Sequence, residues 1–159
     1  DPRRPRPRAG VPPERDHPGM TDPMPVPVVH HVTLTVTDVP RAVAWYEGLF
    51  GPAIVLDRTG PTWVRQRMQW PSGLIIGVSR HDDTGQEGFD CTRVGLDHIG
   101  LACDDEAAVR SWAARLDQLG YEHGPVESVA YGWAVTARDP DGIAIEFFAA
   151  RPIAAPEPT

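Results

Sequence analysis

The strongest constraint on the fold is an internal repeat. The segments 31–36 and 98–103 each begin with a histidine and then alternate apolar residues with small or polar ones, a pattern typical of a half-buried strand. Each segment is followed by an aspartate suited to cap a helix, by apolar residues at helical spacing and by a glycine that ends the helix. Short strand patterns then follow in both copies. The chain is therefore predicted to contain two copies of one βαβββ unit.

The repeat also predicts where each element lies. We expect one helix between Asp38 and Gly51, and a second that begins at Asp104 or Asp105 and stops at Gly120. The strands expected after these helices are 53–57, 62–69 and 74–79 in the first copy, and 122–129, 132–138 and 143–147 in the second. The predicted fold class is α+β, with two tandem βαβββ modules whose helices cover the apolar face and leave a concave surface on the other.

A chain of 159 residues is expected to form one folded domain. Its predicted parts are an N-terminal segment at 1–27, module one at 28–80, a linker at 81–94, module two at 95–150 and a C-terminal tail at 151–159. The N-terminal segment holds nine of the eighteen prolines and five arginines without apolar periodicity, so we expect it to be disordered. Met20 or Met24 is the expected biological start.

Composition excludes several function classes. The formal net charge of −7 argues against a nucleic-acid partner or an anionic membrane, and no apolar run approaches the ~20 residues that span a bilayer. All fifteen basic residues are arginines, so lysine-nucleophile and Schiff-base chemistry is excluded. Cys91 and Cys103 form neither a metal-type nor a redox-type spacing. We therefore expect a protein of the reducing cytoplasm.

The repeat draws attention to three polar residues, two of which occupy the same position in the two copies. His31 and His98 each open the polar face of a strand, and Glu146 lies on the polar face of the last strand, after the turn 139–142. A lone carboxylate there is costly to bury unless something pairs with it. Two histidines and a carboxylate on one concave surface are the ligand set of a divalent metal with open coordination positions. The alternative is three unconnected residues, with each histidine satisfied locally and Glu146 in solvent.

The residues now resemble a known family. Residues 28–150 are similar to the vicinal oxygen chelate superfamily in the motifs His31-Val-Thr-Leu-Thr-Val-Thr-Asp, Trp45-Tyr46, Leu49-Phe-Gly51, His98-Ile-Gly-Leu-Ala, Asp139-Pro-Asp-Gly and Ile145-Glu146. That superfamily includes glyoxalase I, fosfomycin-resistance thiol transferases, extradiol dioxygenases and bleomycin-resistance binding proteins. The resemblance implies paired modules that form a cup around a divalent metal (Fe, Mn, Zn, Ni or Co), and a homodimer whose sites draw on both chains.

Two departures from the family's sequence patterns reduce the number of candidate reactions. When Gly73 is aligned with Gly142, Gly77 falls opposite Glu146, so the further carboxylate ligand of glyoxalase I is missing. The extradiol signature carries a tyrosine where this chain has Thr136, which puts acid–base assistance to ring cleavage in doubt. The resemblance to bleomycin-resistance proteins is weakened by the complete ligand set, because those proteins lack metal ligands.

Further candidate residues share the concave surface. The predicted substrate-binding residues are Thr33, Trp63, Arg65, Arg67, Thr136 and Arg138. Arg65 and Arg67 are suited to hold a substrate carboxylate or phosphate by paired hydrogen bonds, although solvated arginines on a strand are an equal alternative. His30 is expected to point away from the site if His31 is a ligand, and His123 is expected to be solvated in a loop.

The resulting functional prediction is a metal-dependent enzyme. It would act on a small organic substrate that chelates the metal through two neighbouring oxygens, with the metal as Lewis acid and Glu146 as a catalytic proton shuttle. Isomerase, lyase or thiol-addition chemistry is favoured. The alternatives are a metal-free antibiotic-binding resistance protein and an Fe(II) extradiol-type dioxygenase.

Overall fold

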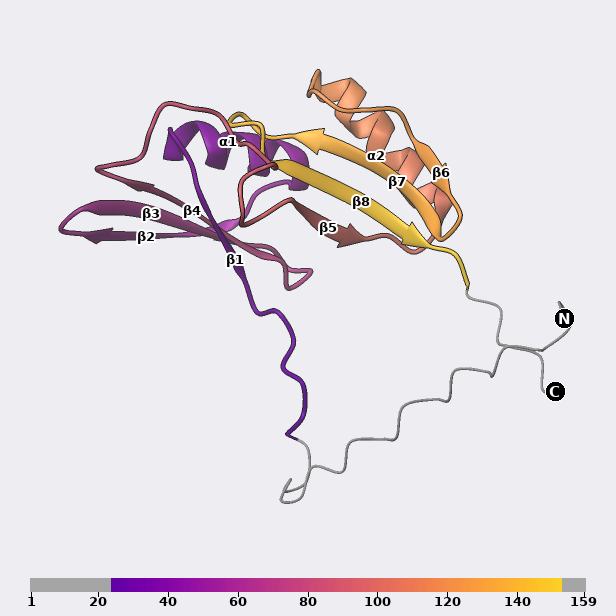
Figure 1. Cartoon of the computed structure of the whole chain (residues 1–159), viewed down its shortest axis with the longest axis horizontal. Coiled ribbons are helices and arrows are strands. Elements are labelled where there is room, and N and C mark those ends of the chain that lie inside the picture. Colours follow the sequence, from indigo (N-terminus) through magenta and orange to yellow (C-terminus); the bar gives the residue numbers. More distant parts are fainter. Residues whose placement is uncertain (1–23, 153–159) are drawn as a thin grey trace, which may run out of the picture.

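The computed structural model describes residues 24–152, which form two four-stranded sheets and two helices (Figure 1). Module one consists of β1 (Val32–Thr35), α1 (Val39–Phe50), β2 (Ile54–Gly60), β3 (Trp63–Gln69) and β4 (Ile75–His81). Module two consists of β5 (His98–Ala102), α2 (Glu106–Leu119), β6 (Glu127–Val129), β7 (Gly132–Arg138) and β8 (Ala144–Ala150). The predicted pair of βαβββ modules is confirmed.

The two sheets have the same topology. Their strand orders are β1-β4-β3-β2 and β5-β8-β7-β6, with the first and last strands of each module parallel and the other pairs antiparallel. This order puts β1 and β5, which lead from the two candidate histidines, at the edge of each sheet. In the part of the chain that the structure describes, neither strand has a partner on its outer side.

Local chemistry explains both helices. The carboxylates of Asp38 and Asp105 each accept a hydrogen bond from a backbone N–H of the first helical turn, at 2.9 Å in both cases, and so satisfy a donor that the helix itself leaves free. Gly51 and Gly120 follow the helices with positive φ, where a side chain would be strained. The predicted caps and stops are confirmed.

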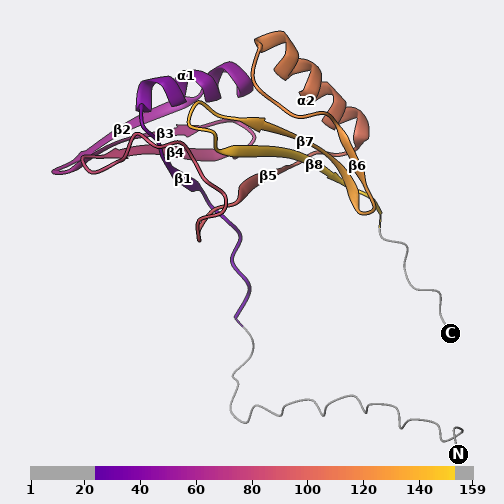
Figure 2. The ribbon, with the colours of Figure 1, turned by 45° about the horizontal axis from the view of Figure 1, so that its top comes forward.

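Both helices lie on the same side of the sheets, and no helix of the described chain covers the other side (Figure 2). The alternating apolar residues face the helices, so Leu34, Ile145 and Phe147 are buried. Aromatic rings join the two modules: Phe50 on α1 contacts Trp112 on α2 with ring centroids 5.7 Å apart, and Trp112 stacks on Phe147 at 4.4 Å. The modules therefore share one core.

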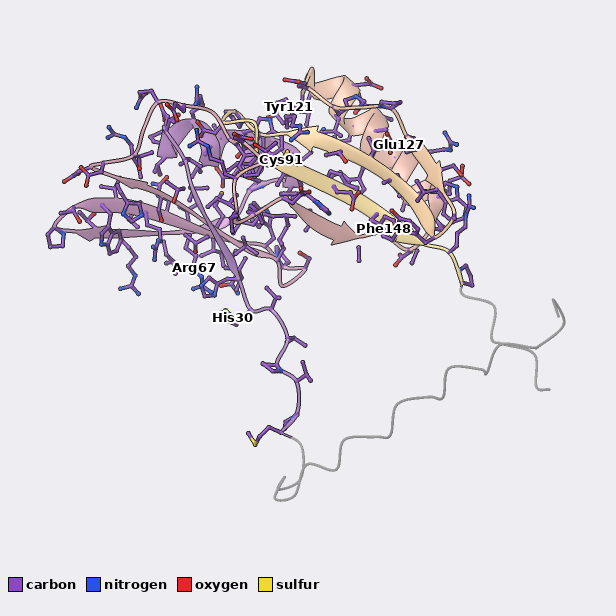
Figure 3. The ribbon with its side chains drawn as sticks, in the orientation of Figure 1. His30, Arg67, Cys91, Tyr121, Glu127 and Phe148 are labelled. Carbon is purple, nitrogen blue, oxygen red and sulfur yellow. The ribbon has the colours of Figure 1, made fainter. Side chains whose placement is uncertain are left out.

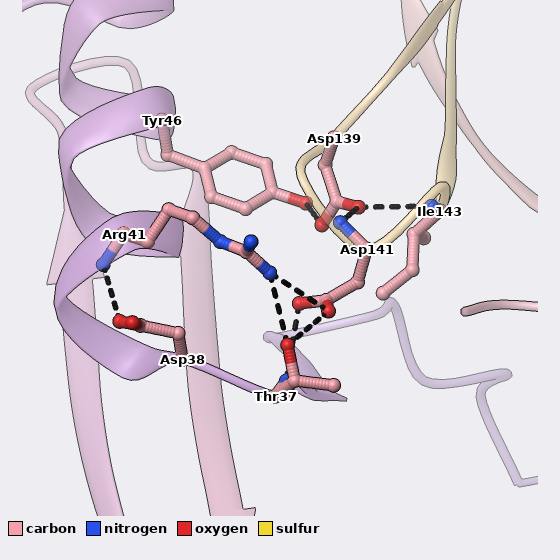
Figure 4. A network of polar contacts seen from close by, with 7 residues as sticks. All are labelled: Thr37, Asp38, Arg41, Tyr46, Asp139, Asp141 and Ile143. Atoms are coloured by element: carbon pink, nitrogen blue, oxygen red, sulfur yellow. Dashed lines mark hydrogen bonds and ion pairs between the residues drawn. The ribbon is translucent and has the colours of Figure 1, made fainter. Parts of the chain in front are cut away.

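The turn between β7 and β8 ties module two to the start of α1 (Figure 4). Asp139 Oδ1 accepts hydrogen bonds from the backbone N–H groups of Asp141, at 2.9 Å, and Ile143, at 2.8 Å. Asp141 in turn accepts from the backbone and hydroxyl of Thr37 and pairs with Arg41 at 3.2 Å. The turn residues thus hold the two modules together as well as opening β8.

Two expectations about module two are corrected. The strand expected at 122–129 is confined to Glu127–Val129, with only an isolated bridge at His123. His123 is not solvated, because its side chain is 15% exposed and hydrogen-bonds Asp117 and the Gly124 carbonyl. Burial disfavours its charged form, but these hydrogen bonds outweigh burial and raise the pKa of His123.

Most of the predicted N-terminal segment and of the C-terminal tail lies outside the described residues. The part of the N-terminal segment that is described, 24–27, is exposed and contains no helix or strand. None of the helices in the described chain is long and apolar enough to cross a membrane.

Candidate functional site

His98 and Glu146 meet on the open face of module two. The parallel pairing of β5 with β8 places Gly100 directly beside Glu146, with His98 two residues earlier on the same face. The Nε2 atom of His98 lies 3.6 Å from Oε2 of Glu146. Gly100 contributes no side chain, so the carboxylate stays accessible, with 24% of its side-chain surface exposed. Two of the three predicted metal ligands are therefore together.

Asp97 fixes the orientation of the His98 ring. Its Oδ1 atom lies 2.6 Å from Nδ1 of His98. A carboxylate can only accept, so Nδ1 carries the proton and the lone pair of a neutral ring remains on Nε2, facing Glu146. In the neutral ring, Nε2 of His98 and Oε2 of Glu146 are two electron-pair donors that face one another, an arrangement that a metal ion, or a second proton on the ring, stabilises. A carboxylate behind a ligating imidazole is the usual support for a metal-binding histidine.

A cavity of about 380 Å³ surrounds this pair. It is lined by His98, Glu127, Val129, Tyr131, Ala134, Glu146 and Phe148. Tyr131 is 70% exposed, and its ring lies 5.9 Å from that of Phe148, so the cavity has an aromatic wall beside its two carboxylates. The cavity of module two is thus acidic and partly aromatic.

His31 lies at a second cavity, on the open face of module one. This cavity of about 320 Å³ is lined by His30, His31, Thr33, Leu56, Arg58, Arg65, Arg67 and Gly77. The pairing registers explain the set, because Gly77 is opposite both Thr33 and Arg67. A side chain at Gly77 would come within 2.8 Å of the Thr33 hydroxyl. Glycine at this position therefore keeps the floor of the cavity open.

The expectation that His30 points away from the site is wrong. Its Nδ1 atom lies 3.0 Å from Nδ1 of His31, and both rings line the same cavity. Both histidines precede β1, which begins at Val32. Side chains point to alternate faces only within a strand, so the strand pattern does not determine the direction of either ring.

The structure does not gather the full predicted ligand set in one chain. Among the residues that it describes, no three His, Cys, Asp or Glu side chains are grouped closely enough to hold a metal ion. His31 and His98 line a common cavity of about 380 Å³ between β1 and β5, but His31 is not part of the His98–Glu146 pair. The donors of module two fit a metal as two ligands of a larger set.

Three of the six predicted substrate-binding residues line a cavity. Thr33, Arg65 and Arg67 line the cavity of module one, and the Arg65 guanidinium lies over the ring of Trp63 at 4.9 Å. Thr136 is paired directly with Glu146 on the neighbouring strand. Arg138 instead donates to the Gly142 carbonyl at 3.2 Å, so its guanidinium is directed to the turn.

Sequence reasoning missed three residues of these sites: Arg58, Asp97 and Glu127. Arg58 is paired across strands with Arg65, and Glu127 lies on the short strand β6. Arg58 and Glu127 could have been found only from the strand register, which the alternation pattern does not contain. Asp97 does have a local signal, since it directly precedes the candidate ligand. Figure 3 shows how the two cavities are separated, with His30 and Arg67 at one and Glu127 and Phe148 at the other.

Comparison with known proteins decides the family. The profile of the Glyoxalase/Bleomycin resistance protein/Dioxygenase superfamily matches residues 28–147. The chain belongs to this superfamily. A solved structure that shares its fold is the glyoxylase/bleomycin resistance protein/dioxygenase domain from Frankia sp. EAN1pec, with 31% identity and a TM-score of 0.73 over 80% of this chain and 94% of that one.

Two more distant structures of the superfamily show the fold alone. Lactoylglutathione lyase from Agrobacterium tumefaciens has 20% identity and a TM-score of 0.60, over 79% of this chain and 96% of that one. A variant of the fosfomycin resistance protein FosX from Listeria monocytogenes, complexed with Mn(II) and 1S,2S-dihydroxypropylphosphonic acid, has 19% identity and a TM-score of 0.56, over 77% of this chain and 91% of that one. No curated protein matches this chain.

Proposed function

We propose that this superfamily member is a metal-dependent enzyme that acts on a small organic substrate chelated through two neighbouring oxygens. The observation that carries the proposal is the His98–Glu146 pair, 3.6 Å apart, with Asp97 holding the imidazole in the tautomer that a metal requires. Membership of a superfamily in which the FosX variant binds Mn(II) supports the same class of cofactor. The candidate metals are Fe, Mn, Zn, Ni and Co.

The chain's own residues suit isomerase, lyase or thiol-addition chemistry. The bound metal would supply a Lewis acid for an oxyanion that develops on the substrate. Glu146 is partly exposed and borders the cavity of module two, so it is placed to accept a proton from a substrate held there. Thr136, paired with Glu146, stands where extradiol enzymes carry a tyrosine, which makes that reaction the weaker candidate.

A second copy of the chain is the proposed source of the third ligand. His31 is not grouped with His98 and Glu146 in one chain, while β1 and β5 are both edge strands without an outer partner in the described structure. The open faces also differ in charge, with arginines at the cavity of module one and Glu127 and Glu146 at the other. In a symmetric dimer, module one of one copy and module two of the other would complete two equivalent sites.

Metal binding is the decisive test. Purified protein is loaded with each candidate metal, dialysed and subjected to elemental analysis, and His98→Ala and Glu146→Gln are treated alongside it. We expect bound metal in the native protein and a steep loss in both variants, with unchanged circular dichroism, because the buried apolar side chains around both positions are untouched. Retention of metal in both variants would show that it binds elsewhere and would remove the proposed site.

The alternative from another class is a metal-free antibiotic-binding protein. The exposed ring of Tyr131 beside Phe148 favours it, because aromatic walls suit a flat organic ligand. Calorimetric titration of chelator-treated protein with bleomycin separates the two. Tight binding without metal, and equally in Glu146→Gln, would favour the antibiotic-binding protein.

We assign the protein to the cytoplasm, since both cysteines are free.

A further inference from the structure

Three arginines converge on the cavity of module one. Arg58 on β2 is paired across strands with Arg65 on β3, and Arg67 lies two residues further along the same face of β3. All three line the cavity that also contains His31. We infer that this cavity binds a doubly charged phosphoryl group, a phosphate monoester or a phosphonate, on the substrate. The inference rests on the proposed function for the rest of the substrate, but the site itself needs no metal.

These arginines have no acidic partner in the structure. Within residues 24–152, no carboxylate lies at ion-pair distance from Arg58, Arg65 or Arg67. Asp57, although it lies on β2, is on the opposite face and accepts from Gln66 at 2.7 Å. Arg58 is exposed and Arg65 and Arg67 are half-buried, so together they give the cavity a positive potential that attracts an anion, in a chain whose net charge is −7.

Arg65 is held in a defined orientation. Its Nε atom donates to the hydroxyl of Ser79 at 2.6 Å, and Ser79 is 1% exposed. The guanidinium also lies over the Trp63 ring, 4.9 Å from its centroid. Because Ser79 occupies Nε, the two terminal nitrogens remain as a pair of donors. This is the fork that binds two oxygens of one oxyanion, and its rotamer is fixed before any ligand arrives.

The number of arginines selects the charge of the ligand. One bidentate arginine satisfies both oxygens and the single charge of a carboxylate. Two further guanidiniums would then stay unpaired beside it. A phosphate monoester offers three terminal oxygens and about 1.5 to 2 negative charges at pH 7. A phosphonate offers the same three oxygens and reaches two charges at mildly alkaline pH, so either group can use donors from more than one arginine. The cavity therefore fits a phosphoryl group better than a single carboxylate.

The arginine cluster lies in the same cavity as His31, one of the proposed metal ligands. The arginines and His31 line the same cavity, with Thr33 and Gly77 between them. A substrate anchored by its phosphoryl group would thus present its neighbouring atoms toward His31. The Thr33 hydroxyl is placed to contact them, because no side chain at Gly77 covers it.

A second copy of the chain offers a competing partner for the arginines. Glu127 lines the acidic cavity of module two and could pair with the arginines across a dimer. In that case the arginines would hold the dimer together, and their loss would change the oligomeric state. Sedimentation velocity of each variant therefore accompanies the binding experiment below.

The test measures anion binding to the full chain by isothermal titration calorimetry after chelator treatment. The probes are methylphosphonate, inorganic phosphate, malonate and acetate, at about pH 8.5, where both phosphorus probes are doubly charged, and at 0.15 M ionic strength so that weak surface pairing is screened. Arg65→Gln and Arg67→Gln are compared with Arg80→Gln, which removes the same charge from β4 on the opposite face of the sheet. Arg65→Lys keeps the charge and removes the fork.

We expect methylphosphonate and phosphate to bind, with affinity reduced on the order of tenfold or more in Arg65→Gln and Arg67→Gln and unchanged in Arg80→Gln. Arg65→Lys should recover only part of the loss. Preference for malonate over both phosphorus probes, equal losses in Arg80→Gln, or dissociation of a dimer in the arginine variants would each overturn the inference. Because metal is absent throughout, failure of the metal site leaves this result unaffected.

Discussion

The hydroxyl of Tyr46 donates a hydrogen bond to Oδ2 of Asp139 at 3.2 Å, across the contact between the two modules. Asp139 is buried, and burial raises the pKa of its carboxyl above the ordinary value despite three hydrogen bonds that favour the charged form. Burial, followed by the charge of Asp139, also raises the pKa of Tyr46. Residue 139 must therefore provide a hydrogen-bond acceptor for the turn, but a negative charge there adds little to the stability of the fold.

The first prediction is that Asp139→Asn retains stability while Asp139→Ala does not. The Asn carbonyl can accept the same two turn N–H groups, and its amide can donate to the Tyr46 hydroxyl. We expect the free energy of unfolding of Asp139→Asn at pH 7 to lie within about 1 kcal/mol of the native value or above it. Asp139→Ala leaves the donors unpaired and should lose about 2–3 kcal/mol. Urea unfolding measures both.

The pH dependence of these variants supplies a second measurement. With its pKa raised in the folded state, Asp139 holds a proton above the ordinary value of 3.8, where the unfolded chain has already released it. Its contribution to stability is therefore complete below 3.8 and is lost as pH rises through the folded pKa. Asp139→Asn should flatten this fall between pH 4 and neutrality. A fall as steep as that of the native protein would assign it to another group.

The second prediction concerns the contact between the modules at Asp141. Its carboxylate is 8% exposed and accepts from Thr37 and Arg41, whereas the Arg41 side chain is 50% exposed. Asp141→Ala should lose about 2 kcal/mol of unfolding free energy, because the Thr37 donors lose their partner in a half-buried place. Arg41→Gln should lose less than about 1 kcal/mol, since water screens its side of the pair. Comparable losses would contradict this assignment.

The secondary structure could be predicted from sequence because its causes are local. Alternation defined which face of β8 is buried and placed Glu146 on the other, and Asp38 and Gly51 marked the ends of α1. The composition of the cavities could not be predicted in the same way. The adjacency of Arg58 to Arg65 depends on the register of β2 with β3. Alternation fixes which face each residue is on, but turn geometry is also needed to choose among registers that differ by two residues.

His30 shows the limit of the alternation argument. Its direction was inferred by extending the strand pattern backward from Val32, but β1 begins at Val32, so the pleat imposes no side on the residues before it. The same reasoning applies to His31, whose ring direction is set by its surroundings. A second chain placed against β1 would be part of those surroundings, which neither the sequence nor one copy contains.

The third prediction tests the support that Asp97 gives to His98. In Asp97→Asn the side-chain amide can donate to Nδ1 as well as accept from it, so the tautomer with a lone pair on Nε2 is no longer enforced. We expect metal affinity to fall about 10- to 100-fold, with the same stoichiometry at saturating metal. Glu127→Gln is the matched control, because it removes one negative charge from the cavity that His98 lines and leaves the Asp97–His98 hydrogen bond in place. Equal losses in the two variants would mean that only the charge of the cavity matters.

The last prediction asks whether one site draws on two chains. His31→Ala and Glu146→Gln should each lack tightly bound metal when purified alone. If His31 of one copy completes the pair His98 and Glu146 of another, then mixing and refolding the two variants together should restore metal to about a quarter of the sites, because half of the dimers are mixed and each of these has one intact site. Elemental analysis of the mixture measures this directly. A site contained in a single chain allows no restoration, since every chain in the mixture lacks one ligand. Mixing Glu146→Gln with His98→Ala is the control: both changes fall on module two, so no combination of these chains can assemble a complete site.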